Sequence, residues 1–194
     1  MSKHHQDIIR NFGMANMLTE VGLDKIEREY NIDLRKGAGQ EDRDEKYYPQ
    51  FEAAIRNEAA QMAQHYEIFY CLEKSIRGII RDRLQEFGEN WWEEKIPEQV
   101  KTEAKKRHEE ELGRGVTPRS YDLLDYTNFG ELNTIINKNW DESFSDMFSN
   151  RDAVRNVMTM LNTLRGPIAH CSPLAEDEVT RLHMSLRDWF RLME

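Results

Sequence analysis

The longest regular feature of the sequence is an apolar repeat between Pro49 and Phe87. Its large side chains follow one another at steps of three, four or seven residues: Phe51, Ile55, Met62, Tyr66, Phe69, Leu72, Ile76, Ile80, Leu84 and Phe87. This spacing places them along one face of an α-helix. Pro49 suits the first helical turn and Gly88 the position after the last. The repeat predicts one helix of roughly forty residues, and such a length is compatible with a kink near residues 59–65.

Shorter helical patterns fill the rest of the chain, and no alternation of period two predicts a strand. Helices are expected from Pro97 to Leu112, over residues 121–126, 129–137 and 140–148, after Asn150, and from Ser172-Pro173 onward. Their candidate N-caps include Asn128, Asp141 and Asn150. The predicted buried face of the last helix is Val179, Leu182, Leu186, Trp189 or Phe190, and Met193. The fold class that follows is all-α.

The first 46 residues are expected to form a separate part of the chain. Residues 5–34 carry apolar side chains at mostly helical spacing, interrupted by Gly13 and Gly22, and residues 36–46 contain glycine and charge without an apolar residue. This pattern predicts a helical extension followed by a charged linker. We therefore divide the chain into an N-terminal extension, residues 1–46, and a helical domain, residues 47–194.

Charge and cysteine content exclude several classes of protein. The net charge of −9 argues against a general nucleic-acid coat, although the cluster between Arg151 and Arg165 would allow a locally basic cleft. Cys71 and Cys171 form no CxxC pair, and no histidines have metal-ligand spacing, so we expect neither a metal nor a cofactor. No apolar run approaches the ~18 residues of a membrane span, which favours a soluble, cytoplasmic protein.

The residues best suited to chemistry are Arg165 and His170. Arginine is a forked donor for phosphate oxygens, and histidine is the side chain that gains and loses a proton near neutral pH. Five helical residues turn through roughly 500°, so these two side chains would lie about 140° apart on an ideal helix. Pro167, between them, predicts a kinked or tightened helix, which would bring both toward one cleft. The same spacing also fits a surface arginine and a histidine at a helix end.

The surroundings of this pair resemble the HEPN superfamily. An apolar helix ends in Leu164-Arg165-Gly166-Pro167-Ile168-Ala169-His170, followed by a Cys-Ser-Pro turn and an amphipathic last helix. Many all-helical HEPN domains carry an Arg-x4–6-His motif near the C-terminus. The resemblance includes Tyr70-x-x-Glu73-x-x-x-Arg77 and Trp91-Trp92, covers roughly residues 60–194, and looks closest to HEPN domains attached to a transcript-surveillance nuclease or standing alone in prokaryotes.

The resemblance implies an antiparallel helical bundle and a metal-independent endoribonuclease. In such an enzyme the ribose 2′-OH attacks its own phosphate, with Arg165 and His170 as catalytic residues. The residues expected to bind RNA or support the site are Asn162, Arg155, Glu73 and Arg77. Family analogy further implies a homodimer, and a role in phage defence or a toxin–antitoxin system with an antitoxin or defence-protein partner.

Three questions stay open on the sequence alone. The position after the motif arginine is usually polar in active HEPN members, whereas here it is Gly166. This departure and the acidic composition favour a non-catalytic HEPN-like module that binds RNA or a protein. Glu73 and Arg77 either form a solvent-facing pair or brace the motif-bearing helix, and Asn162 either orients Arg165 or is an ordinary exposed residue.

Overall fold

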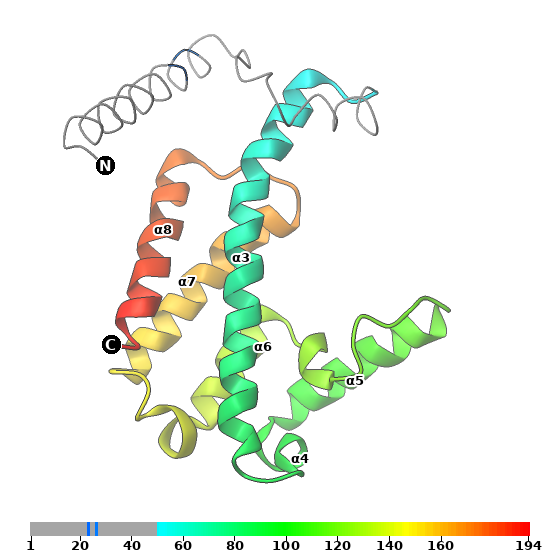
Figure 1. The fold of residues 1–194 in the computed structure, drawn as a ribbon, viewed down its shortest axis with the longest axis vertical. Coiled ribbons are helices and arrows are strands. Elements are labelled where there is room, and N and C mark those ends of the chain that lie inside the picture. The colour runs from blue at the N-terminus through cyan, green and yellow to red at the C-terminus, as the bar shows by residue number, and fades with distance from the viewer. Residues whose placement is uncertain (1–22, 24–25, 27–49) are drawn as a thin grey trace, which may run out of the picture. The chain divides into compact units, whose positions relative to one another are not determined.

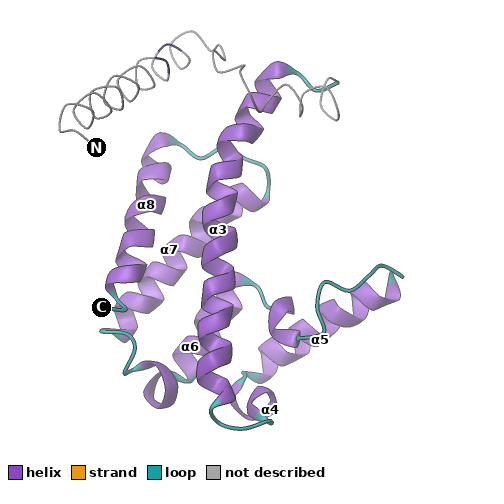
Figure 2. Cartoon of the chain, in the orientation of Figure 1, coloured by secondary structure: helices purple, strands orange, loops and turns teal. Residues whose placement is uncertain are grey.

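The computed structural model describes residues 23, 26 and 50–194. Figures 1 and 2 show helices joined by loops, and this described part of the chain contains no strand. The elements are α3 (Ala53–Gln85), α4 (Trp91–Lys95), α5 (Glu98–Gly113), the 3₁₀ helix η1 (Leu123–Tyr126), α6 (Phe129–Lys138), the π-helix η2 (Trp140–Phe144), α7 (Arg151–Ala169) and α8 (Glu176–Arg191). The predicted all-α class is confirmed.

The apolar repeat forms α3, which runs without interruption through residues 59–65. Its buried hydrophobic stripe keeps the predicted spacing: Phe69, Leu72, Ile76, Ile80 and Leu84. Earlier in the repeat, Phe51 and Ile55 are exposed. Periodicity therefore predicted which face of the helix is apolar, but the extent of that face that neighbouring helices cover depends on the tertiary fold.

α7 places one apolar face in the core. Its buried residues are Val154, Met158, Leu161, Leu164 and Ile168. Asn150 caps the helix as expected, since its side chain accepts a hydrogen bond from the Ala153 N–H at 2.9 Å. The helix continues through Pro167 to Ala169. Proline removes only the backbone hydrogen bond to the carbonyl four residues earlier, that of Thr163, and the loss falls in the last turns of the helix.

α8 packs against α7, and Figure 1 shows the pair beside α3. The predicted start at Ser172-Pro173 is wrong, because α8 begins at Glu176. The chain first turns through Cys171, whose φ of 55° is left-handed, and the Ser172 N–H bonds back to the Pro167 carbonyl at 2.9 Å. Trp189 is the buried residue of the predicted alternative pair.

α6 and η2 connect the arm described below to α7. Asn128 caps α6 as predicted, and it forms a capping box with Glu131 in which each side chain accepts from the other's backbone N–H. Asp141 is not a cap, since η2 starts at Trp140 and follows Asn139. The backbone N–H of Ser145 reaches the Trp140 carbonyl, which closes the wider π-helical turn.

α5 extends away from α7 and α8 as a charged arm (Figure 1). Its only buried residues are Val100 and Ala104. Beyond the arm's end, the Arg119 side chain and backbone N–H both donate to the Glu111 carboxylate, and these bonds hold the pKa of Glu111 below its usual value. The loop after α5 is thus tied back along the helix. Trp91, before the arm, is buried, which fits an anchoring role.

The predicted N-terminal extension and charged linker, residues 1–46, lie outside the described residues except for Leu23 and Ile26. The chain divides into two compact units after Arg56, and every residue used below belongs to the second, residues 57–194. Within the described residues, no helix is long and apolar enough to cross a membrane.

Candidate functional site

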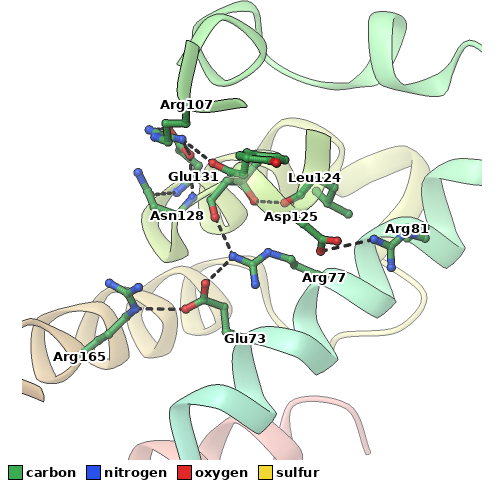
Figure 3. A network of polar contacts seen from close by, with 11 residues as sticks. Glu73, Arg77, Arg81, Arg107, Leu124, Asp125, Asn128, Glu131 and Arg165 are labelled. Carbon is green, nitrogen blue, oxygen red and sulfur yellow. Dashed lines mark hydrogen bonds and ion pairs between the residues drawn. The ribbon is translucent and has the colours of Figure 1, made fainter. Parts of the chain in front are cut away.

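Glu73 on α3 links two arginines from different parts of the fold (Figure 3). Its Oε1 accepts from Nη2 of Arg77, one turn along the same helix, and its Oε2 accepts from Nε of Arg165 on α7 at 3.1 Å. The Glu73 side chain is 15% exposed, so water screens these contacts only partly. The sequence left open whether Glu73 and Arg77 form a solvent-facing pair or brace the helix that carries Arg165. This geometry agrees with the second interpretation, because Glu73 contacts Arg165 on α7.

Arg77 extends the same network to the start of α6. Its Nη2 also donates to the Thr127 carbonyl at 2.7 Å, and Thr127 lies between η1 and α6. Its Nε is buried without a hydrogen-bond partner among the described residues. One buried guanidinium therefore ties together α3, the η1–α6 connection and, through Glu73, α7.

Neighbouring carboxylates are also paired with arginines (Figure 3). Arg107 donates both terminal nitrogens to the Glu131 carboxylate, at 2.8 and 2.7 Å, and these hydrogen bonds raise the pKa of Arg107. Arg81 forms a second pair with Asp122 at 2.6 Å, and lies 3.7 Å from Asp125. Because these contacts join α3, α5 and α6 to the η1 region, they fix the backbone around Arg77 and Glu73.

An open cavity of about 480 Å³ lies beside this network. Its charged lining residues are Lys74, Arg77, Arg119, Arg165, Glu73 and Asp125. Four cationic groups thus face two carboxylates, whereas the whole chain has a net charge of −9. Of the arginines between Arg151 and Arg165, where the sequence allowed a basic cleft, only Arg165 lines this cavity. The excess of cationic lining groups suits an anionic ligand better than the overall charge does.

Arg165 stands at this cavity with most of its donors unused. Its Nε is engaged by Glu73, but its two terminal nitrogens have no hydrogen-bond partner in the described part of the chain. In Figure 3 they extend from the side of the guanidinium away from the carboxylate. A guanidinium held at Nε keeps two terminal NH₂ groups for a ligand, and such a fork matches two phosphate oxygens.

His170 occupies a different position from Arg165. It is the C-cap of α7, is exposed, and is not among the residues that line the cavity. After it, the Cys171 N–H bonds the Ile168 carbonyl at 3.3 Å and the Ser172 N–H bonds the Pro167 carbonyl at 2.9 Å. This pair of bonds, with left-handed Cys171, is a Schellman turn. Because α7 stays helical to Ala169, the proline does not bring the two side chains together in one chain.

The two other predicted residues on α7 lie outside the cavity. Arg155 pairs with Asp152 at 3.0 Å, ten residues or about 15 Å along the helix from Arg165. Asn162 lies against the start of α6, since a Cβ on Gly130 would be 3.6 Å from its Nδ2. It makes no hydrogen bond to Arg165 within the described residues.

Sequence reasoning missed several polar cavity residues, among them Lys74, Tyr66 and Arg119. Tyr66 lies seven residues before Glu73 on α3, and Lys74 lies four residues after Tyr70, so helical spacing from Glu73 and Tyr70 would have found them. Arg119 comes from the loop between α5 and η1. No pattern predicts that this loop returns to α3, because its position depends on the Arg119–Glu111 contacts.

Gly166, the departure from the active HEPN pattern, has open space around it. A Cβ at this position would meet no atom within 4 Å. The glycine is therefore not required by packing. Among the described residues, no group of three His, Cys, Asp or Glu side chains is placed to hold a metal ion.

Comparison with known families agrees with the all-helical fold. The family described as Swt1-like HEPN matches residues 67–194, about two thirds of the chain, including the Glu73–Arg77 pair and the Arg165–His170 motif. No curated protein and no solved structure matches the chain significantly. HEPN domains are often associated with ribonuclease activity. With this match over an all-helical domain, the predicted resemblance is confirmed: the chain belongs to the Swt1-like HEPN family.

Proposed function

We propose that this protein is a metal-independent endoribonuclease of HEPN type, with Arg165 and His170 as its catalytic residues. The observation that carries the proposal is the position of Arg165 in a HEPN domain. Glu73 holds its Nε at the wall of a cavity with an excess of cationic groups, and its terminal nitrogens have no partner among the described residues. A fixed guanidinium in such a place stabilises negative charge that builds on phosphoryl oxygens.

The reaction needs one proton removed and one supplied. The ribose 2′-oxygen forms a bond to the adjacent phosphorus, and the bond from phosphorus to the 5′-oxygen breaks. A neutral imidazole accepts the 2′-OH proton, and an imidazolium donates a proton to the leaving 5′-oxygen. The products are a 2′,3′-cyclic phosphate and a 5′-OH. Arg165 donates to the non-bridging oxygens throughout, so no metal is required in this scheme.

The separate positions of the two residues support a site completed by a second copy of the chain. His170 is exposed at the end of α7, while Arg165 faces the cavity. A two-fold axis near the 165–170 segment would place two histidines beside two arginines, since each subunit contributes the same patch. One histidine would then serve as base and its mate as acid. We propose a homodimer of this kind.

The direct test is cleavage of a labelled single-stranded RNA with and without EDTA. We expect cleavage by the wild type to survive EDTA, and His170→Ala to lose about 10²–10⁴ in rate. Arg165→Lys should also fail, because an ammonium keeps the charge but not the planar fork. His183→Ala and Arg187→Ala, exposed on α8, are matched controls and should cleave normally. Activity abolished by EDTA, or unchanged in His170→Ala, would show that the chemistry is different.

A second candidate function is a non-catalytic HEPN module that binds RNA or a protein. The observation that favours it is the absence of His170 from the lining of the cavity, together with Gly166 after the motif arginine. This candidate predicts RNA or protein binding without cleavage, and binding that depends on Arg165 but not on His170. The same series of variants separates the two functions.

The biological setting that family analogy suggests is phage defence or a toxin–antitoxin system with a protein partner. An endoribonuclease in such a system halts growth of its host when it is expressed alone. We expect expression of the wild type to arrest growth, and Arg165→Ala to relieve the arrest. Normal growth with wild-type protein present at the same level would argue against this role.

A further inference from the structure

Two tyrosines on α3 stand at the mouth of the cationic cavity without being part of the core. Tyr66 and Tyr70 both line the cavity, and they are 60% and 55% exposed. Their ring centroids lie 6.2 Å apart with an interplanar angle of 37°. By contrast, Phe69 between them is buried and packs edge-on against Phe129. The two tyrosines therefore present aromatic surface to solvent beside a cavity lined by more cationic than acidic groups.

The tyrosines and the cationic groups form one continuous stripe. Tyr66, Tyr70, Lys74 and Arg77 follow at steps of four, four and three residues, so they share one face of α3 over about 16 Å. Arg165 and Arg119 reach the same cavity from α7 and from the loop after α5. Proteins that bind single-stranded nucleic acid combine aromatic faces with cations, because the bases stack on the rings while the phosphates pair with arginine or lysine.

We propose that Tyr66 and Tyr70 form a stacking platform for the bases of single-stranded RNA whose phosphates lie against Lys74, Arg119 and Arg165. The inference rests on the proposed function, since it takes the same RNA as ligand and places its bases beside the motif arginine. The platform selects unpaired RNA, because a paired base is stacked inside a helix and cannot lie on a side-chain ring. It carries little preference for base identity, since every base has a π-face.

The test measures binding without cleavage. The probe is a fluorescein-labelled 2′-O-methyl oligouridine of roughly ten nucleotides, within the usual range for a single-strand site, which has no free 2′-OH to react. We expect Tyr66→Ala and Tyr70→Ala each to weaken its binding about 5- to 100-fold in fluorescence anisotropy, the range for removal of one stacked base. Tyr66→Phe and Tyr70→Phe should bind as the wild type does, because the ring remains.

Tyr121→Ala is the matched control. Tyr121 is 91% exposed and does not line the cavity, so its loss should leave binding unchanged. A second control replaces the probe by an abasic chain with the same phosphates. The wild type should bind it as weakly as the Tyr66→Ala/Tyr70→Ala double variant binds the intact probe.

Three results would overturn the platform: no binding of the intact probe by the wild type, equal binding of the intact and abasic probes, or alanine variants that bind as Tyr121→Ala does. A double variant that becomes monomeric in light scattering without weaker binding per chain would instead place the tyrosines between two copies. The probe cannot be cleaved, so binding and cleavage are measured separately. If the probe binds through the tyrosines but ordinary RNA is not cleaved, the proposed nuclease is refuted and the platform is not. Cleavage by a protein whose binding ignores Tyr66 and Tyr70 would refute the platform alone.

Discussion

Arg165 and His170 lie five residues apart on one helix, yet their surroundings have little in common. The Arg165 side chain is held by Glu73, which is itself bound to buried Arg77 and through it to Thr127. The His170 ring is exposed and has no hydrogen bond or ion pair within the described residues. What is fixed at His170 is the backbone, by the two hydrogen bonds of the Schellman turn. One residue is positioned by its side chain and the other by its main chain.

This difference has a consequence for catalysis. A group that stabilises charge must be preorganised, and the Glu73 contact supplies that for Arg165 within a single chain. A proton carrier needs hydrogen-bond reach to its substrate, and an exposed ring at a helix end gains it only when RNA or a second subunit arrives. The contrast thus favours a site whose arginine half is complete in the monomer and whose histidine half is completed by assembly.

The largest expected effect comes from mixing subunits. If two His170 rings serve one composite site, a dimer with one His170→Ala chain is inactive. At equal amounts of both chains after subunit exchange, about one quarter of the dimers are fully wild type, so activity per chain falls to about one quarter of the wild-type value. Two independent sites would give about one half. The measurement is cleavage rate against the fraction of His170→Ala protein.

A linear fall in that titration would mean that each chain works alone, and that the contrast between Arg165 and His170 does not reflect assembly. Tyr121→Ala protein mixed in the same proportions is the control for dilution and exchange, since Tyr121 does not line the cavity and its loss should leave the rate unchanged.

The next largest effect concerns Glu73. Glu73→Ala leaves the buried Arg77 guanidinium without its carboxylate, and we expect it to lower the free energy of unfolding by about 2–4 kcal/mol, because breaking a buried ion pair strands a charge. Arg165→Ala removes a partner that is 35% exposed, and should cost about 1 kcal/mol or less. Urea unfolding of both variants measures the difference.

Glu109→Ala, which removes an exposed partner of Lys105 on the arm, serves as the control for loss of a surface carboxylate. If Arg165→Ala and Glu73→Ala were equally destabilising, the network would depend on the α3–α7 contact and not on buried Arg77. The Glu73→Ala protein should also cleave RNA poorly even where it is folded, because Arg165 loses the contact that orients it.

The sequence predicted those features around Arg165 and His170 that depend on local spacing. Glu73 and Arg77 are one helical turn apart, and Asn128 and Asn150 precede apolar helical runs, so the ion pair and both caps follow from the pattern. The sequence likewise placed Arg165 and His170 about 140° apart before any tertiary contact was known. It then expected Pro167 to correct that angle, whereas the helix continues through the proline.

The parts that the sequence could not predict depend on contacts between distant segments. Arg119 reaches the cavity because its loop is bonded back to Glu111, and nothing in the local pattern of residues 113–120 specifies that return. Asp141 looked like a cap by residue type, but the helix there starts one residue earlier as a π-helix. The delayed start of α8 has a similar cause, because the chain closes the Schellman turn before a new helix begins.

A smaller effect concerns pH, and it must be known before a rate profile is assigned to His170. The pKa of His65 on α3 is lowered, first by burial and then by the charge of His183 on α8. Its Nδ1 is buried without a partner among the described residues. The folded protein therefore binds fewer protons at His65 than the unfolded chain does. The contribution of His65 to the free energy of unfolding is complete above its ordinary pKa of 6.5, and it is lost as the pH falls below that value.

We expect the wild-type urea midpoint to fall between about pH 7.5 and about pH 5.5, and His65→Gln to show a smaller fall over the same interval. A fall of equal size in His65→Gln would assign the pH dependence of folding to other groups. Activity that is lost at acid pH in the wild type but kept in His65→Gln would report unfolding. Only the pH dependence of the cleavage rate that both proteins share would be assigned to Arg165 and His170.

The smallest effect tests whether the backbone alone positions His170. Cys171 follows it with a φ of 55°, a left-handed conformation that costs a residue with a Cβ about 1–2 kcal/mol. Cys171→Gly removes that cost but adds freedom to the unfolded chain, so we expect a net gain of about 0.5–1 kcal/mol in the free energy of unfolding and unchanged cleavage.

Cys171→Val keeps the N–H that bonds the Ile168 carbonyl, but a β-branched side chain is strained at positive φ. It should therefore lose about 1–2 kcal/mol and loosen the turn. If the turn positions the imidazole, Cys171→Val should also lower the cleavage rate while Arg165-dependent RNA binding stays normal. Equal rates in the glycine and valine variants, at a temperature where both are folded, would mean that His170 is placed by its partner in the complex and not by the end of α7.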